Sequence, residues 1–466
     1  MRRSFFFIIF QTQVGVGVLS LPSSLYAGAG TDGWITLLVT GVAIQLIIFI
    51  LYFLSNRFPS LTLFEYGTKI IGKYAAFIVS LLYILFAIST AVIVLELFET
   101  TIKTWILFRT PMLVILLLLT VSGTYLAVGR IKVMGRFYQF VSILIVPLVI
   151  MSAYTLKDAD IRYIMPIGQN GIGTILKATQ QGIVSMLGFE IVLFIYPFVQ
   201  TKGKTALKSL TLANVAVTLL YSFLTFTTYV FFSPAQLEMI PEPLVYMLKG
   251  VSFVIVDRVD LIFLSIWIVS VMTSYVSYLY IAGRGIQHLT KRKKTTGPIL
   301  VAAFTALILA MFSHDRYTVE MLSGYHAKAS YFFALGFPLV LFLMSLLFKK
   351  KRGVAMNKKL YQCLILLSML ILLTSCWDQE LLKESKLIYG AGFDYENEDE
   401  IRTTFVVRNL GVPVSQGGVY SNRIISIAGP SPRATRIEMD RIISKQVTAS
   451  KNQLLLLGGR SSKTQR

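Results

Sequence analysis

Two segments of the sequence combine residue types that could bind a small molecule. Gly15 and Gly17 interrupt one apolar run, and Gly188 interrupts another just before the acidic residue Glu190. A helix that breaks at membrane depth leaves backbone N–H and C=O groups free to bind substrates or ions. An acid at the same depth could bind a proton or the ammonium of an amino acid. These residues therefore favour reversible binding of a ligand.

We expect the two interruptions to form one binding site that offers close backbone approach, polar groups and one charge. The candidate residues are Gly15, Val16, Gly17, Val18, Ser185, Met186, Gly188 and Glu190. Glu190 is the one acid that lies well inside an expected membrane segment. Two simpler explanations stay open: small residues permit close helix packing, and Glu190 could be a protonated carboxyl bonded to a backbone carbonyl.

The apolar segments contain no pattern of catalytic or metal-binding side chains. They have no nucleophile with a neighbouring base, no glycine-rich phosphate loop and no histidines at metal-ligand spacing. We expect His288, His314 and His326 to be ordinary surface residues in loops. The sequence therefore predicts that the protein is not an enzyme and that it needs no cofactor.

The composition places these segments in a membrane. The chain is 55% hydrophobic and only 14% charged, and its mean hydropathy is +0.69, so it has too few polar residues to cover a soluble globule. Its net charge of +21 comes from short basic clusters between apolar runs, a pattern that does not fit nucleic-acid binding. We interpret the basic run 291–294 as a signal for membrane topology, with possible contact to anionic lipids.

The length of the apolar runs predicts ten transmembrane helices, because a bilayer core about 30 Å thick needs about 20 apolar residues per helix. The predicted helices cover residues 5–26, 34–54, 75–97, 111–129, 137–156, 179–200, 207–232, 259–282, 298–313 and 328–348. Lys and Arg concentrate at the N-terminus and in every second loop, while most acids lie on the other side. We therefore expect a cytoplasmic N-terminus.

The two interruptions fall in the first and sixth predicted helices. With ten helices, these two are the corresponding members of two five-helix halves, and paired interruptions at such positions are typical of transporters built from inverted repeats. Because five is odd, the halves cross the membrane in opposite directions. We therefore predict an all-α membrane protein with a 5+5 inverted repeat and a site near the bilayer midplane.

After the tenth helix the sequence changes character. A basic stretch at 356–359 precedes an apolar run at 360–373, and a Leu-Thr-Ser-Cys tetrapeptide ends at Cys376. This order is typical of a bacterial lipoprotein signal, in which the cysteine is acylated. The alternative is an eleventh helix. A chain that enters the membrane after the tenth helix would deliver Cys376 to the extracytoplasmic face.

The remaining sequence predicts part of a soluble α+β domain. Alternating and amphipathic patterns predict strands at 385–392, 401–408, 423–428 and 453–457, and a helix at 434–447. We divide the chain into a ten-helix domain (1–352), a signal segment or eleventh helix (356–375) and a partial extracytoplasmic domain (376–466).

Two motifs resemble the endospore germination permeases, the GerAB-type B subunits of nutrient receptors. The run 11–22, followed by Asp32-Gly33-Trp34, resembles their first helix, and the run 187–190, followed by Tyr196-Pro197-Phe198, resembles their sixth. The resemblance covers residues 1–350. It implies the LeuT-like fold of the amino acid/polyamine/organocation transporters.

The C-terminal part resembles a second germination protein. Cys376-Trp377-Asp378 and the run 389–394 resemble the start of the GerAC-type lipoproteins, of which about the first third is present. Genes for B and C subunits typically lie side by side. A natural fusion, a frameshift or a gene-model error would each give this chain.

These resemblances imply a membrane subunit of a germinant receptor, which binds a small nutrient such as an amino acid and triggers germination. The implied partners are A-type and C-type subunits together with membrane lipids, and the implied location is the cell membrane or inner spore membrane. The alternative is a secondary amino acid transporter coupled to protons or cations, because fold alone does not separate the two functions.

Overall fold

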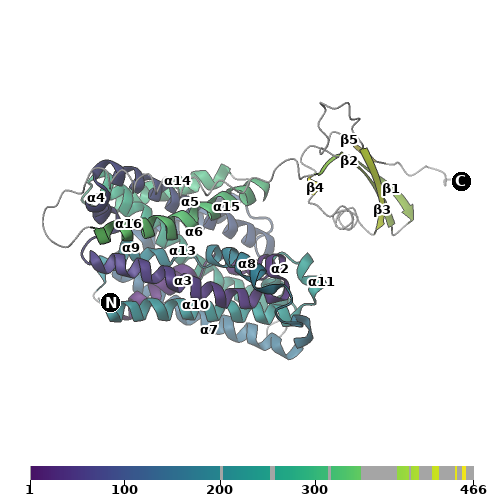
Figure 1. The fold of residues 1–466 in the computed structure, drawn as a ribbon, viewed down its shortest axis with the longest axis horizontal. Coiled ribbons are helices and arrows are strands. Elements are labelled where there is room, and N and C mark those ends of the chain that lie inside the picture. The colour runs from purple at the N-terminus through teal and green to yellow at the C-terminus, as the bar shows by residue number, and fades with distance from the viewer. Residues whose placement is uncertain are drawn as a thin grey trace. The chain divides into compact units, whose positions relative to one another are not determined.

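The structure of the protein is a computed structural model. It describes residues 2–199, 203–251, 258–312, 316–347, 386–397, 400–408, 422–429, 447–448 and 454–457. The chain divides into two compact units, Met1–Ile371 and Leu372–Arg466. The first unit is helical and the second holds a β-sheet (Figure 1).

Each predicted transmembrane segment coincides with an apolar helix or with a broken pair of helices. The helices are α1 (Arg2–Gln13), α2 (Leu21–Ala29), α3 (Gly33–Arg57), α4 (Leu63–Ile71), α5 (Lys73–Trp105), α6 (Met112–Val128), α7 (Ile131–Tyr154), α8 (Gly171–Ser185), α9 (Val192–Ile195), α10 (Lys204–Phe231), α11 (Pro234–Met239), α12 (Pro243–Lys249), α13 (Val259–Thr290), α14 (Thr296–Phe312), α15 (Arg316–Tyr331) and α16 (Phe337–Leu347). Six helices in the described part are long and apolar enough to cross a membrane, a bent pair adds a seventh, and α6 and α14 are shorter apolar helices.

The first predicted segment is interrupted between α1 and α2. We call residues 14–20 the first break; it contains a single short 3₁₀ turn, η1 (Val16–Val18). Pro22 lies in the first turn of α2, where its missing N–H costs no helical hydrogen bond. The sequence therefore ends one helix and begins the next within the same apolar run.

The sixth predicted segment is interrupted after α8. We call residues 186–188 the second break; it ends at Gly188, whose φ of +122° is a conformation that side-chain-bearing residues rarely adopt. A short 3₁₀ turn, η5 (Phe189–Ile191), leads into α9. The two helical halves on either side are bent by 54°.

The long helix α13 lies at the centre of the helical unit. It packs against α5, α6, α7 and α14, while α1 packs against α7, α10 and α13. The outward faces of α5, α6 and α7 expose large apolar side chains, among them Phe77, Val121 and Ile143. Such continuous apolar surfaces are stable when they face lipid.

Two expectations about histidines were wrong. His288 and His326 lie in α13 and α15 rather than in loops, and His326 stacks on Phe86 of α5 with 5.0 Å between ring centroids. Two further acids, Glu96 and Glu99, are only 2% and 8% exposed on α5, at and beyond the end of the predicted segment 75–97. The physical reason is helix length: these helices continue beyond the apolar runs, and neighbouring helices cover their polar ends.

The second unit holds a five-stranded sheet. Its strands are β1 (Lys386–Asn397), β2 (Glu400–Arg408), β3 (Asn422–Gly429), β4 (Val447–Thr448) and β5 (Leu454–Leu457). The order is β3-β2-β1-β4, with β1 antiparallel to β2 and parallel to β4 and β5. The predicted strands are confirmed. The predicted helix at 434–447 is wrong at Val447, which lies in β4, because Val447 pairs with β1. Residues 434–446, the signal segment and Cys376 lie outside the described residues, and the predicted domain limits stay predictions.

Candidate functional site

The two breaks lie against each other. A Cβ atom placed on Gly17 would be 3.6 Å from the Ser185 hydroxyl oxygen and 3.8 Å from its Cα, so η1 runs directly beside the end of α8. On the other side, a Cβ on Gly188 would be 2.5 Å from the carbonyl oxygen of Thr12. The structure therefore brings the predicted site residues of both segments together, and their role as ligand contacts stays a prediction.

Side chains from other helices bond the backbone groups that the first break leaves without helical partners. The Tyr221 hydroxyl of α10 accepts a bond from the Gly15 N–H and donates to the Gln13 carbonyl, both at 3.1 Å. The Ser274 hydroxyl of α13 lies 3.0 Å from the Thr12 carbonyl and 3.3 Å from that of Val14. Tertiary contacts thus compensate for the interrupted helix, as the ends of buried helices require.

A chain of buried hydroxyl groups continues these hydrogen bonds into the end of α1, on the N-terminal side of the first break. Thr12 and Ser277 hydroxyls are 2.8 Å apart, and the Tyr138 hydroxyl is 2.8 Å from the same Ser277 oxygen. The Thr273 hydroxyl donates to the Gln11 carbonyl at 3.0 Å. Such a connected network holds the end of α1 in one position against α7 and α13.

Gln13, the last residue of α1, has an unusual side chain. It is fully buried, yet neither its Nε2 nor its Oε1 has a hydrogen-bond partner in the part of the chain that the structure describes. The amide of nearby Gln11, in contrast, donates to the Ser142 hydroxyl at 3.0 Å. An unsatisfied buried amide costs about 1–3 kcal/mol, so a polar ligand at the break would recover free energy that the protein alone loses.

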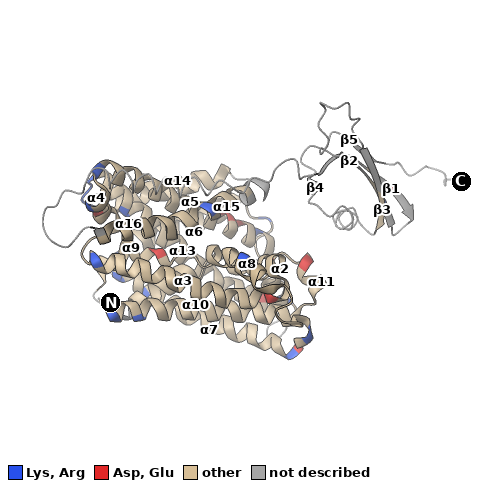
Figure 2. Cartoon of the chain, viewed as in Figure 1, with Lys and Arg blue, Asp and Glu red and all other residues tan. Residues whose placement is uncertain are grey.

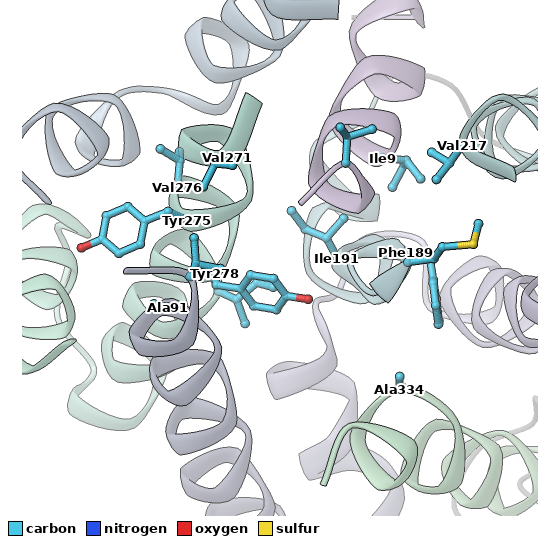
Figure 3. Close-up of a cluster of buried hydrophobic side chains, with 14 of the residues drawn as sticks. Ile9, Ala91, Phe189, Ile191, Val217, Val271, Tyr275, Val276, Tyr278 and Ala334 are labelled. Carbon is cyan, nitrogen blue, oxygen red and sulfur yellow. The ribbon is translucent and has the colours of Figure 1, made fainter. Parts of the chain in front are cut away.

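Glu190 lies at the second break and is fully buried. One carboxylate oxygen accepts a bond from the Gly188 N–H at 2.9 Å, and the other accepts from the Tyr278 hydroxyl at 2.6 Å. Figure 3 shows the Tyr278 ring directed toward the turn that holds Phe189 and Ile191, while Tyr275 points the opposite way. The Gly188 N–H is a donor, whereas the Tyr278 hydroxyl can donate to an ionised carboxylate or accept from a protonated one, so these contacts fit both forms of Glu190.

The carboxylate of Glu190 has no positive partner. Among the described residues, no Lys, Arg or His lies within ion-pair distance of it. A buried charge without a counter-charge is costly. A cationic group brought by a ligand would therefore be favoured here.

The remaining predicted site residues differ in how closely other atoms approach them. Gly188 fits the simpler explanation, since its missing side chain allows close packing with α1. Gly15 and Gly17 do not, because the nearest atoms to their Cβ positions are 3.6 Å away, an ordinary contact distance. Val18 and Met186 are buried apolar residues within the two breaks, and Val16 lies with Val18 in η1.

The sequence analysis did not include in the site the residues that complete it, which are Gln13 at the end of α1 and five residues of α10 and α13. Their shared signal is a polar side chain inside an apolar span, which in membranes commonly bonds across helices. They are Gln13, Tyr221, Thr273, Ser274, Ser277 and Tyr278. Many other hydroxyls in the spans carry the same signal, so the pattern alone does not select these six.

Sequence comparison identifies both parts of the chain. Residues 2–319 match the spore permease family, described as spore germination protein, and residues 378–464 match the family described as spore germination protein N-terminal domain. Spore germination protein GerQB of Bacillus cereus is 25% identical over 346 residues, which cover 73% of this chain and 93% of that protein. Spore germination protein A2 of Bacillus subtilis strain 168 is 26% identical over 349 residues, covering 74% and 94%.

Solved transporters share the fold. Mhp1, a nucleobase-cation-symport-1 family transporter in a closed conformation with bromovinylhydantoin, has a TM-score of 0.54 at 14% identity, covering 71% of this chain and 78% of that one. MhsT in complex with L-phenylalanine has a TM-score of 0.53 at 13% identity, covering 81% and 99%. The predicted LeuT-like arrangement is confirmed. Because the family match spans more than half of the chain, the protein belongs to the spore germination protein family, as a multi-pass membrane member with a transporter fold.

Proposed function

We propose that the protein is the nutrient-binding membrane subunit of a spore germinant receptor, and that a free amino acid binds between its two breaks. Membership of the spore germination family supports the germination role. The observation that carries the ligand assignment is the fully buried, unpartnered amide of Gln13 at the first break. A ligand with both a donor and an acceptor would satisfy an amide in this state, and an amino acid has both.

The charge of the second break supports the same ligand class. Glu190 is buried and has no positive partner among the described residues. Each of its oxygens accepts one bond, and a carboxylate oxygen can accept a second. The ammonium of an amino acid would supply both the missing charge and a donor, while its carboxylate would accept from the Gln13 amide.

Binding at this position would act on conformation. A ligand that bridges Gln13, just before the first break, and Glu190, just after the second, is bound best when the two breaks are close together. It would therefore shift the population toward that conformation. The family supports association with other germinant receptor subunits. We propose that A-type and C-type subunits receive the signal, and that the protein lies in the inner spore membrane with its N-terminus in the cytoplasm.

The test exploits the space at Gly17. Alanine fits there because its Cβ would have no neighbour closer than 3.6 Å, whereas leucine would reach the Ser185 side chain. We expect spores with Gly17→Leu to lose the fall in optical density that amino acids trigger, and spores with Gly17→Ala to keep it. Both variants should reach the membrane at the normal level. A normal response by the leucine variant would refute the site.

Binding and transport are separable in a second experiment. Proteoliposomes that contain this protein alone should bind labelled amino acid without accumulating it inside. Accumulation driven by a proton or cation gradient would instead support the secondary transporter.

A further inference from the structure

A polar pocket lies away from the breaks, where α4, the start of α5 and the end of α13 meet. Its volume is about 600 Å³, and four cationic side chains line it: Lys73, Arg284, Lys291 and Arg292. Glu65 is the one carboxylate in its lining. Figure 2 shows Lys and Arg gathered at the end of the helical unit that holds the N-terminus and α4.

The described residues neutralise the positive charge of this pocket only in part, because Glu65 offsets one of the four cations. The Glu65 carboxylate is already bonded by the N–H and the hydroxyl of Thr62, at 2.7 and 2.9 Å, where it caps the start of α4. Arg284 donates to the Gln287 amide oxygen at 2.9 Å. None of the four cations forms an ion pair with a described carboxylate.

The backbone is unfavourable at two of these cations for different reasons: the helix dipole disfavours the charge of Lys73, whereas at Lys291 only the backbone conformation is unfavourable, because a cation at a helix C-terminus is favoured. Lys73 is the first residue of α5, where the positive end of a helix dipole repels a cation. Lys291 ends α13 with a φ of +53°, a conformation in which glycine is strongly preferred. Retention of a loop in the cytoplasm requires only that cations be present. It does not require them to converge on one pocket, and a bound anion would offset the unfavourable position of Lys73.

The pocket opens onto an apolar stripe. Phe77 lines the pocket and is 53% exposed, and Leu81 and Leu85 are 42% and 54% exposed. These residues are spaced by four on α5, so they lie on one face of the helix. An acyl chain could follow this stripe from the pocket into the bilayer, which a soluble anion would not need.

We propose that the pocket binds the headgroup of an anionic phospholipid, whose phosphate lies among the four cations and whose acyl chain lies along α5. This site is independent of the nutrient site. The lipid would hold the end of α13, the helix that also carries Ser274 and Tyr278.

The test uses the full chain in nanodiscs of phosphatidylcholine with increasing phosphatidylglycerol. The midpoint of thermal unfolding should rise with phosphatidylglycerol and then saturate. In the variant with Lys73→Gln and Lys291→Gly, half-saturation should need about 30-fold more phosphatidylglycerol, which corresponds to about 2 kcal/mol for two cations near an anionic lipid. A control with Lys204→Gln and Lys208→Gln removes two exposed cations outside the pocket and should saturate like the wild type.

The variant Lys291→Gly alone separates binding from folding. Glycine relieves the positive φ, so unfolding in pure phosphatidylcholine should not begin at a lower temperature, while the response to phosphatidylglycerol weakens. If the control with Lys204→Gln and Lys208→Gln lost as much of the response to phosphatidylglycerol, the lipid would be attracted by diffuse surface charge. That result would overturn the site. A second result would also overturn the lipid assignment. If inorganic phosphate stabilised the detergent-solubilised protein and abolished its stabilisation by phosphatidylglycerol, the ligand would be a soluble anion.

Discussion

The substitution Gly188→Ala tests whether the contact between the two breaks holds the site together. Gly188 has a φ of +122°, and a Cβ there would be 2.5 Å from the Thr12 carbonyl oxygen, 2.6 Å from its carbon and 2.9 Å from the Gln13 nitrogen. Real Cβ atoms do not approach backbone this closely. The end of α1 must therefore move away from the second break.

The expected cost has two parts. A residue with a side chain in such a backbone conformation costs about 1–3 kcal/mol, and overpacking of a well-packed region costs about 1–3 kcal/mol more. Gly188→Ala should therefore lower the free energy of unfolding by roughly 2–6 kcal/mol. It should also weaken the nutrient response, because η1 and Ser185 are separated.

The matched control lies on the preceding helix. Gly173 is exposed in α8 and has no atom within 4 Å of its Cβ position, so Gly173→Ala should be neutral or stabilise the helix by up to about 1 kcal/mol. The assay is unfolding of the purified protein in mixed micelles titrated with denaturing detergent. If Gly188→Ala were as stable as Gly173→Ala, the contact between α1 and the second break would not exist as described.

Two further substitutions address the polar groups of the site. Tyr278→Phe removes one of the two donors to the buried Glu190 carboxylate and should cost about 1.5–3 kcal/mol in the same unfolding assay, whereas Tyr125→Phe, at an 87% exposed residue, should change stability by less than about 0.5 kcal/mol. Gln13→Leu removes an unsatisfied amide, so we expect it to keep or raise stability by about 1–3 kcal/mol while abolishing the response of spores to amino acids. Destabilisation by Gln13→Leu would mean that the amide is paired within the protein.

Much of the fold followed from local pattern. In lipid each helix must satisfy its own backbone, so a spanning helix requires a long apolar run, and the position of each run can be found without knowledge of its neighbours. The breaks could be located for the same reason, because Gly15, Gly17 and Gly188 weaken a helix through their own conformational freedom. The period-two pattern of residues 401–408 likewise predicted β2.

The sequence by itself thus determined the membrane segments, the two breaks and the acid beside the second one. Only the tertiary structure decided how the breaks are completed. Tyr221 bonds Gly15 across 206 positions and Tyr278 bonds Glu190 across 88, so these pairs depend on how α10 and α13 pack against the breaks. The same holds for Gln11 and Gln13, which are identical in type and two positions apart. One finds partners on neighbouring helices and the other finds none among the described residues. The geometry of the neighbouring helices decides whether a polar side chain in a membrane finds a hydrogen-bond partner or stays available to a ligand. The residues around it in the sequence do not encode that geometry.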